Sequence, residues 1–256
     1  MKILLPFQDP YNRPLSHKIV SGGTEQFMKS IKDNFDTIVY QIPIEQIDWP
    51  QKEKVEIAQN IINLAEAYKV DAIVSNFAQA VYNSQHLIKS NIPIMFIEHC
   101  VYPIPNTIYR WNQGINRGHS MFLVSKWQEK KYEQMSKRTK IDVLKIAGYI
   151  NPSYCKVKPK MVEPEYDCGT IGRCDNGKSP FKLKTMTKGT DIKSLVLTSQ
   201  TQFDKDALVK AIKSFDNIDR KAIQESTWEK HNKKQWKKDF TNAVDKTIEI
   251  FRSKNG

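Results

Sequence analysis

The stretch AIVSNFAQAVYNSQHLIKSNIPIMFIEH, residues 72–99, holds the unit from which the fold follows. Residues 72–77 and 92–99 are short apolar runs rich in β-branched and aromatic side chains, which predicts two strands. Residues 79–89 between them are predicted to form a helix. A strand, a helix and a second strand in succession predict a parallel pair joined by a right-handed crossover.

The same alternation extends to both sides of this stretch. Further strands are predicted at residues 2–7, 37–42 and 121–125 and within 141–147, and further helices at 25–35, 53–68 and 126–138. Six strands within about 150 residues fit one Rossmann-like domain with a parallel sheet. In such sheets ligands bind beyond the carboxyl ends of the strands, so candidate site residues are sought there.

A second, smaller unit is predicted after a break. Residues 151–165 contain three prolines without periodicity and are interpreted as a linker. Beyond it the pattern predicts strands at 168–173 and 194–199, short helices at 179–186, 205–214 and 219–225, and a long helix over about 227–252. The expected fold class is therefore α/β: a Rossmann-like domain over 1–150, then a reduced second α/β domain over 166–256 that ends in long helices.

Composition and charge narrow the class of protein. The chain has 256 residues, 39% hydrophobic and 27% charged, which supports a sizeable core and argues against disorder. No run of 18 apolar residues occurs, so no membrane span is expected. The short apolar start ends at Pro6 and predicts a strand rather than a signal peptide. Four cysteines without a CxxC pair favour a reducing compartment, and a cytoplasmic location is expected.

The net charge of +12 is unevenly distributed. Residues 1–125 hold 11 basic and 11 acidic side chains, whereas residues 126–256 hold 29 basic and 17 acidic ones. An excess confined to one half favours a polyanionic or phosphate-bearing partner. The alternative is a lysine-rich surface that serves solubility alone.

Two features follow predicted strands of the first domain. Gly22 and Gly23 come after the first strand, where glycine lets backbone N–H groups approach a phosphate near a helix N-terminus. His99 closes the fourth strand, where an imidazole can contact a sugar hydroxyl or share a proton. The alternatives are a loop that needs glycine for its geometry and a histidine with a structural role.

A loop after the fourth strand mixes aromatic and basic residues. Arg110, Trp111 and Arg117 could stack on bases and contact phosphates of a nucleic acid or another acceptor. The same aromatic side chains could instead fold back onto the core.

The second unit contains two further candidate motifs. Arg173 and Lys178 flank a glycine-containing turn, and two cations at this spacing can hold a diphosphate. Asp204 and Asp206 form a DxD pattern that can hold a metal, but acids at the start of a helix are better explained as caps. No metal site is expected.

Near the C-terminus, Trp228, Trp236 and Phe240 are expected to form a packing stripe with lysines on the opposite face.

Together these residues resemble the retaining GT-B glycosyltransferases that use nucleotide sugars. The resemblance rests on Gly22-Gly23-Thr24-Glu25, the strand-end His99, and residues 147–152, which are similar to the segment where that family's chain crosses between domains. Its most specific element is Gly172-Arg173 with Lys178, which matches the family's GR-x4-K motif, and residues 226–230 (STWEK) resemble its final helix. The FIEH strand, this motif and the basic charge are closest to bacteriophage DNA α-glucosyltransferases.

The resemblance implies transfer of a sugar from a nucleotide diphosphate sugar such as UDP-glucose to a hydroxyl, with retention and without a metal or other cofactor. It implies that Arg173 and Lys178 hold the donor diphosphate, that Gly22 and Gly23 allow close approach of a substrate, and that His99 contacts the reacting sugar. Hydroxymethylated bases of phage DNA are one acceptor that it implies.

The sequence departs from the family in its second half. The acidic E-x7-E donor-binding loop is not found, and the roughly 105 residues after 151 are too few for a second complete Rossmann-like domain. A non-catalytic, shortened GT-B protein that binds nucleic acid through its basic C-terminal half is therefore the alternative.

Overall fold

The computed structural model of the chain describes residues 1–7, 22–42, 51–76, 85–99, 116–139, 146–158, 168–171, 188–190, 194–197 and 219–256. The chain divides into two compact units. Unit 1 comprises Met1–Lys156 and Lys230–Gly256, and unit 2 comprises Val157–Glu229. The chain therefore leaves unit 1 once and returns to it for its last residues.

Unit 1 is built on a six-stranded parallel sheet in the order β2-β1-β3-β4-β5-β6. The strands are β1 (Lys2–Phe7), β2 (Asp36–Gln41), β3 (Ala72–Asn76), β4 (Ile94–Glu98), β5 (Ser120–Leu123) and β6 (Gly148–Tyr149). Their apolar runs suit strands that are buried on both faces, as in all-parallel sheets. The predicted α/β class and parallel sheet are confirmed. The sixth strand of the described sheet is at Gly148–Tyr149, and most of the range 141–147, where a strand was predicted, lies outside the described residues.

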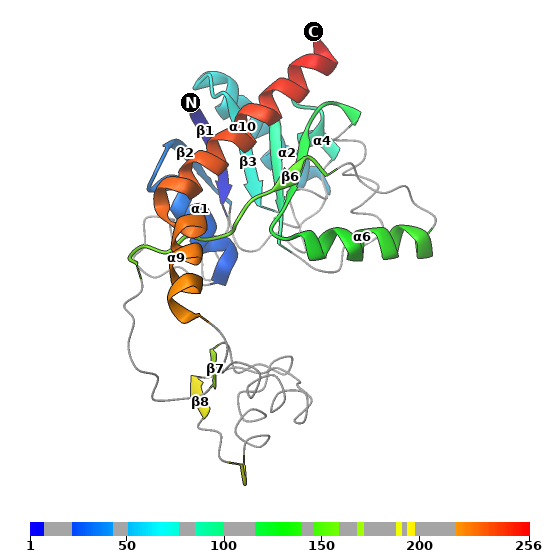
Figure 1. Cartoon of the computed structure of the whole chain (residues 1–256). Coiled ribbons are helices and arrows are strands. Elements are labelled where there is room, and N and C mark those ends of the chain that lie inside the picture. Colours follow the sequence, from blue (N-terminus) through cyan, green and yellow to red (C-terminus); the bar gives the residue numbers. More distant parts are fainter. Residues whose placement is uncertain are drawn as a thin grey trace. The chain divides into compact units, whose positions relative to one another are not determined.

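Helices cover both faces of this sheet (Figure 1). On one face lie α2 (Gln51–Ala67), α4 (Gln85–Ile88) and α6 (Lys126–Thr139), which contribute to one core cluster. On the other face lie α1 (Gly22–Lys32) and α10 (Lys233–Asn255), which contribute to a second core cluster. Alternate residues of β4 enter the two clusters, as the two-residue period of a strand requires.

The C-terminal helix α10 crosses the sheet face beside α1 (Figure 1). Its buried residues recur at helical spacing: Trp236, Phe240, Ala243, Val244 and Thr247. Phe240 is fully buried, with its ring centroid 4.8 Å from that of Phe35 and 6.3 Å from that of Phe27. The expected packing role of Trp236 and Phe240 is thus confirmed, with the exposed Lys233, Lys234 and Lys238 away from the core.

The expected single helix over 227–252 is in fact two helices. α9 (Arg220–His231) is followed by α10, which begins at Lys233. Asn232 lies between them and caps α10 with its side chain, while its own backbone is extended. The Asn232 Oδ1 accepts a hydrogen bond of 2.9 Å from the Gln235 N–H. Trp228 therefore belongs to α9 and does not share a helix with Trp236.

The segment by which the chain leaves unit 1 and the segment by which it returns are joined by hydrogen bonds within unit 1. The Cys155 N–H donates to the His231 carbonyl oxygen at 2.7 Å, and the Trp236 indole N–H donates to the Asn151 carbonyl oxygen at 3.0 Å. The Asn151 amide also hydrogen bonds to the His231 ring. The outgoing and returning segments thus lie side by side.

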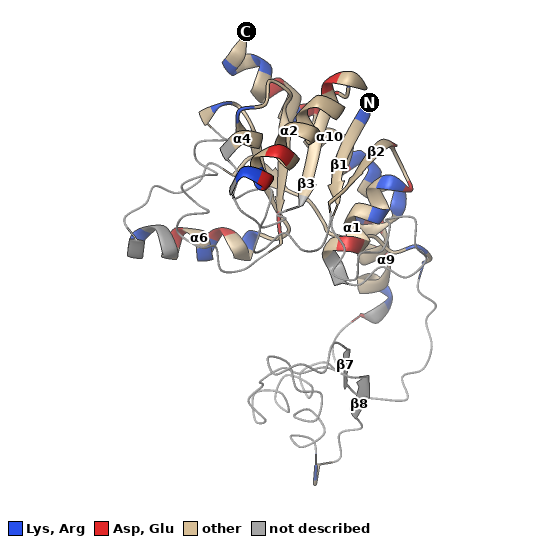
Figure 2. Ribbon diagram, turned by 180° about the vertical axis from the view of Figure 1, so that it is seen from behind, with Lys and Arg blue, Asp and Glu red and all other residues tan. Residues whose placement is uncertain are grey.

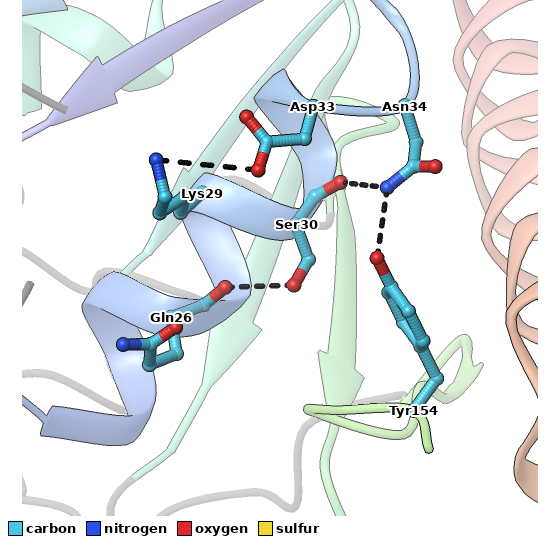
Figure 3. Close-up of polar contacts among 6 residues, drawn as sticks. All are labelled: Gln26, Lys29, Ser30, Asp33, Asn34 and Tyr154. Atoms are coloured by element: carbon cyan, nitrogen blue, oxygen red, sulfur yellow. Dashed lines mark hydrogen bonds and ion pairs between the residues drawn. The ribbon is translucent and has the colours of Figure 1, made fainter. Parts of the chain in front are cut away.

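The outgoing segment is also anchored to α1 (Figure 3). The Asn34 amide donates to the Tyr154 hydroxyl at 3.2 Å and to the Ser30 carbonyl oxygen at 2.7 Å, which satisfies a carbonyl near the helix end. The Tyr154 ring packs 5.1 Å from Trp236, measured between centroids. Tyr154, just before the exit from unit 1, therefore contacts α10 and the turn that follows α1.

Unit 2 contains the parallel pair β7 (Cys168–Ile171) and β8 (Ser194–Leu197), followed by most of α9. The register aligns Cys168 with Ser194 and Ile171 with Leu197. Both strands fall where the sequence predicts them, whereas the helices expected at 179–186 and 205–214 lie outside the described residues.

The division into units differs from the expected domains in one respect. Lys230–Gly256 belongs to unit 1, although the sequence placed it in the second domain. This also reassigns the charge: residues 157–229 hold 13 basic and 11 acidic side chains, so unit 2 carries +2 and unit 1 carries +10. The basic excess lies mainly in residues 126–156 and 230–256, at +5 each.

Candidate functional site

The strand order defines where a ligand site is expected. β1 lies between β2 and β3, so the chain passes from β1 to the strand on one side and then crosses back to the strand on the other side. In an open parallel sheet, such a reversal of direction opens a crevice at the carboxyl ends of the two strands where it occurs, here β1 and β3. His99, directly after β4, and Ser125, just after β5, lie at this same edge of the sheet.

His99 is brought to α1 at this edge. Its ring lies edge-on to Phe27, with 5.5 Å between ring centroids. Phe27 is fully buried and lies in the N-terminal half of α1, which begins with Gly22 and Gly23. Two of the predicted features, the glycine pair and the strand-end histidine, thus belong to neighbouring elements.

The environment of His99 sets its protonation state. Burial lowers the pKa of His99 from 6.5 to about 4, because the charged form loses hydration. The imidazole is therefore neutral near pH 7. A neutral ring can exchange hydrogen bonds with a hydroxyl group, but it adds no positive charge for a phosphate.

The N-terminus of α1 supplies a different kind of group. The first N–H groups of a helix have no intrahelical partner and favour anions. Gly22 and Gly23 occupy these positions in α1, and Glu25 places an acidic residue in the same first turn. The glycine pair is therefore inside the helix rather than in the preceding loop, and its backbone is at the edge where the sequence expected it.

A buried glutamine, which sequence reasoning missed, fixes this edge. Gln128 of α6 accepts hydrogen bonds from the N–H groups of Val124 (2.8 Å) and Ser125 (3.0 Å). Its amide donates to the Glu98 carbonyl oxygen at 3.1 Å. One side chain thus joins the carboxyl ends of β4 and β5 and holds the residue before His99. A glutamine in the first turn of a helix that follows a strand was the available signal.

Glu98 and His99 are neighbours in the sequence but differ in where their side chains lie. Glu98 is the last residue of β4 and is buried, and alternation along the strand places it on the α2–α4–α6 face. His99 contacts Phe27, which belongs to the opposite core cluster. The two side chains therefore lie on different faces of the sheet.

Arg117 lies away from this edge. It precedes β5, so it belongs to the amino-end edge of the sheet, opposite His99. Its guanidinium donates to the Lys89 carbonyl oxygen at 3.2 Å, and its own carbonyl accepts from the Asn255 amide at 2.9 Å. Arg117 is thus part of the contact between the sheet edge and the end of α10, and the structure does not bring it together with His99.

The neighbouring His119 has a structural role. It is fully buried, its Nδ1 accepts from the Ile94 N–H at 3.2 Å and its Nε2 donates to the Ile88 carbonyl oxygen at 2.8 Å. Its ring stacks on Phe251 of α10 with centroids 5.3 Å apart. Burial lowers the pKa of His119 to about 4, partly opposed by the hydrogen bond to Ile88.

The buried His119 predicts a loss of stability in acid. Unfolded chains protonate this histidine near pH 6.5, whereas the folded protein resists protonation until about pH 4. Falling pH therefore favours unfolding through this window, by about 1.4 kcal/mol per pH unit. Urea titrations at pH 7 and pH 5 should show a shallower fall in the free energy of unfolding for His119→Gln than for the wild type. Equal falls in both proteins would contradict this origin of the pH dependence.

The remaining predicted site residues lie outside the described part of the chain: Arg110, Trp111, Arg173, Lys178, Asp204 and Asp206. Among the described residues there is no cluster of three or more His, Cys, Asp or Glu side chains suited to a metal ion. None of the described helices is both long and apolar enough to cross a membrane.

Comparisons with known proteins give no family for the chain, so only its fold can be used to classify it. No protein-family model matches the chain, and a search of curated proteins likewise gives no match. The described residues define an α/β protein with an open six-stranded parallel sheet and a candidate ligand edge at the carboxyl ends of its strands.

Proposed function

We propose that the chain is a glycosyltransferase of the GT-B type, which transfers a sugar from a nucleotide diphosphate sugar to a hydroxyl acceptor. The observation that carries the proposal is the position of the Gly172-Arg173…Lys178 motif. In the sequence the motif follows Ile171, the last residue of β7, and it lies itself outside the described residues. β7 and β8 form a parallel pair, and phosphate groups bind at the carboxyl ends of parallel strands.

The organisation of the chain supports the same proposal. A parallel α/β unit is followed by a second unit with its own parallel strands, and residues 147–152, which resemble the family's crossing segment, lie within unit 1 shortly before the chain leaves it after Lys156. In the proposed reaction, Arg173 and Lys178 are the candidate cations for the donor diphosphate, and His99 and the N-terminus of α1 are candidate substrate contacts of unit 1. Because the sequence has no acidic E-x7-E loop, the proposed donor contacts are those with the diphosphate.

The proposed roles follow from the charge of each group. Arg173 and Lys178 would neutralise negative charge as the diphosphate leaves, and this function needs no metal ion. His99, neutral near pH 7, would hydrogen bond to a hydroxyl of the reacting sugar. The N-terminus of α1 would bind anionic or hydroxyl oxygens of a substrate through the backbone N–H groups of Gly22 and Gly23. Retention of configuration is proposed from the family resemblance.

Donor binding tests the proposal through thermal stability. A nucleotide sugar that binds only the folded protein at 100 times its Kd should stabilise it by about 2.7 kcal/mol. We expect UDP-glucose or a related donor to raise the Tm of the wild type and to have little effect on Arg173→Ala plus Lys178→Ala. The matched control, Lys158→Ala plus Lys188→Ala, removes two exposed lysines of the same unit and should respond like the wild type. A wild type that responds to no nucleotide sugar would contradict the proposal.

A second candidate function is nucleic-acid binding without catalysis. The charge of unit 1 favours it, since +10 of the net +12 lies there. The sequence assigns the basic excess to the C-terminal half, residues 126–256, and the two parts that carry most of it, residues 126–156 and 230–256, belong to unit 1. Any polyanion held mainly by this charge should therefore bind to unit 1, and its affinity should fall steeply with salt.

A further inference from the structure

Helix α6 carries an exposed tryptophan among lysines. Trp127 lies in its first turn and is 52% exposed, although tryptophan is usually largely buried. The Nζ of Lys131 lies 5.2 Å from the centroid of the Trp127 ring. The ring is thus about half exposed to solvent and has a cation over one of its faces.

Helical spacing places more lysines on the same side. Lys130 and Lys131 follow Trp127 by three and four residues and share its face, and Lys137 follows Lys130 by seven. Lys130 and Lys137 are exposed. We name Trp127, Lys130, Lys131 and Lys137 the α6 stripe.

Helix α6 also carries acidic residues. Figure 2 shows that both charge signs occur along this helix. Glu129 and Glu133 are spaced by one turn, and the Glu129 carboxylate accepts a hydrogen bond from the Tyr149 hydroxyl of β6. Glu129 therefore faces β6, whereas Glu133 lies three residues after Lys130 and four before Lys137 and is their neighbour on the helix surface. The first turn of the α6 stripe, with Trp127 and Lys131, carries the cation that lies nearest the aromatic ring.

The buried face of α6 fixes the orientation of the stripe. Gln128 and Tyr132 are buried, with 1% and 2% of their surfaces exposed. Gln128 binds the ends of β4 and β5, so the first turn of α6 is held at the carboxyl-end edge of the sheet. The α6 stripe thus begins at the same edge as His99.

We infer that the α6 stripe binds a single-stranded polynucleotide. An aromatic face next to a row of cations fits an unstacked base followed by its phosphates, because the base stacks on the ring and each phosphate pairs with an ammonium group. A duplex offers the phosphates but keeps its bases stacked, so it fits the stripe less well. The charge of +10 on unit 1 complements the polyanion.

The inference goes beyond the proposed sugar transfer and does not require it. Polynucleotide binding is measured without a nucleotide sugar, whereas donor binding is measured without a nucleic acid. A failure to bind polynucleotide would therefore leave the donor-binding measurement unaffected, and the reverse also holds.

Fluorescence anisotropy with labelled oligo-dT and oligo-U tests the inference. Wild type should bind at low salt, and Trp127→Ala should weaken binding about 5- to 150-fold, the range for the loss of one stacked base. Trp127→Phe should retain most of the affinity. Lys130→Ala plus Lys131→Ala should reduce the slope of log affinity against log salt by about 2. A labelled duplex should bind more weakly than oligo-dT, and the ratio of oligo-dT to oligo-U reports any preference for sugar type.

The matched control is Lys234→Ala plus Lys238→Ala, which removes two exposed lysines from α10 of the same unit. It should change the affinity of the single strand by less than about threefold, because the stacking contact remains. All the substituted side chains are exposed or partly exposed, and unchanged thermal melting verifies that each variant is folded. Absent binding at low salt, an unaltered affinity in Trp127→Ala, tighter binding of the duplex, or an equal loss in the α10 control would each overturn the inference.

Discussion

Phe240→Ala is expected to lower the free energy of unfolding by about 3–5 kcal/mol, the usual cost of removing a buried phenyl ring. The ring is fully buried and packs against Phe27, Phe35 and Trp236, with centroid distances of 6.3, 4.8 and 5.5 Å. Its removal leaves a cavity between α10 and α1. Since a domain is typically stable by only 5–15 kcal/mol, this one change removes a large part of the total.

Urea unfolding followed by circular dichroism measures this loss. The control is Lys238→Ala, an exposed position on the same helix, which should change the free energy of unfolding by less than about 0.5 kcal/mol. A change below about 1 kcal/mol for Phe240→Ala would mean that α10 does not complete the core of unit 1.

Gly118→Ala is the second substitution with a large expected effect. Gly118 has a φ of +91°, and an added Cβ would lie 2.9 Å from the Cα of Phe251 in α10. Positive φ costs an L-residue about 1–2 kcal/mol, and the overlap with backbone atoms adds to this. We expect a total loss of about 2–4 kcal/mol, because the end of α10 must move away from the sheet.

Gly189→Ala separates the two causes. Gly189 also has positive φ, at +78°, but among the described residues a Cβ there meets no atom within 4 Å. It should therefore cost only the conformational part, about 1 kcal/mol. Differential scanning calorimetry of both variants provides the comparison, and equal small effects would show that the contact between Gly118 and Phe251 is unimportant.

The parts of the fold that depend on local periodicity could be predicted. Short apolar runs indicate strands such as β4, and helical spacing of apolar residues indicates helices such as α2. The alternation of strands and helices then predicts a parallel sheet. The burial of Trp236 and Phe240 was predicted for the same reason. Spacing shows which side of a helix is buried, but not which element it packs against. The return of α10 to unit 1 was therefore missed.

Two other features had weak or overlooked signals. The break at Asn232 follows from an asparagine cap with Gln235 three residues later, a known helix-start pattern hidden within a long helical periodicity. The role of Gln128 depends on backbone groups of β4 and β5 that come together only in the folded sheet. In the candidate site, the position of His99 at the carboxyl-end edge of the sheet could be predicted because it directly follows a strand. Arg117 was grouped with the loop after β4, but it directly precedes β5 and therefore lies at the amino-end edge.

The most direct test of the account is the release of UDP from UDP-glucose, with and without a hydroxymethylated DNA acceptor. The proposed function predicts turnover by the wild type and by the Lys158→Ala plus Lys188→Ala control. It predicts a rate lower by about 100-fold or more for Arg173→Ala plus Lys178→Ala, the scale of losing electrostatic stabilisation of a leaving group. Equal rates in all three proteins, or no turnover by a wild type that is folded, would contradict the proposal that the motif after β7 serves sugar transfer.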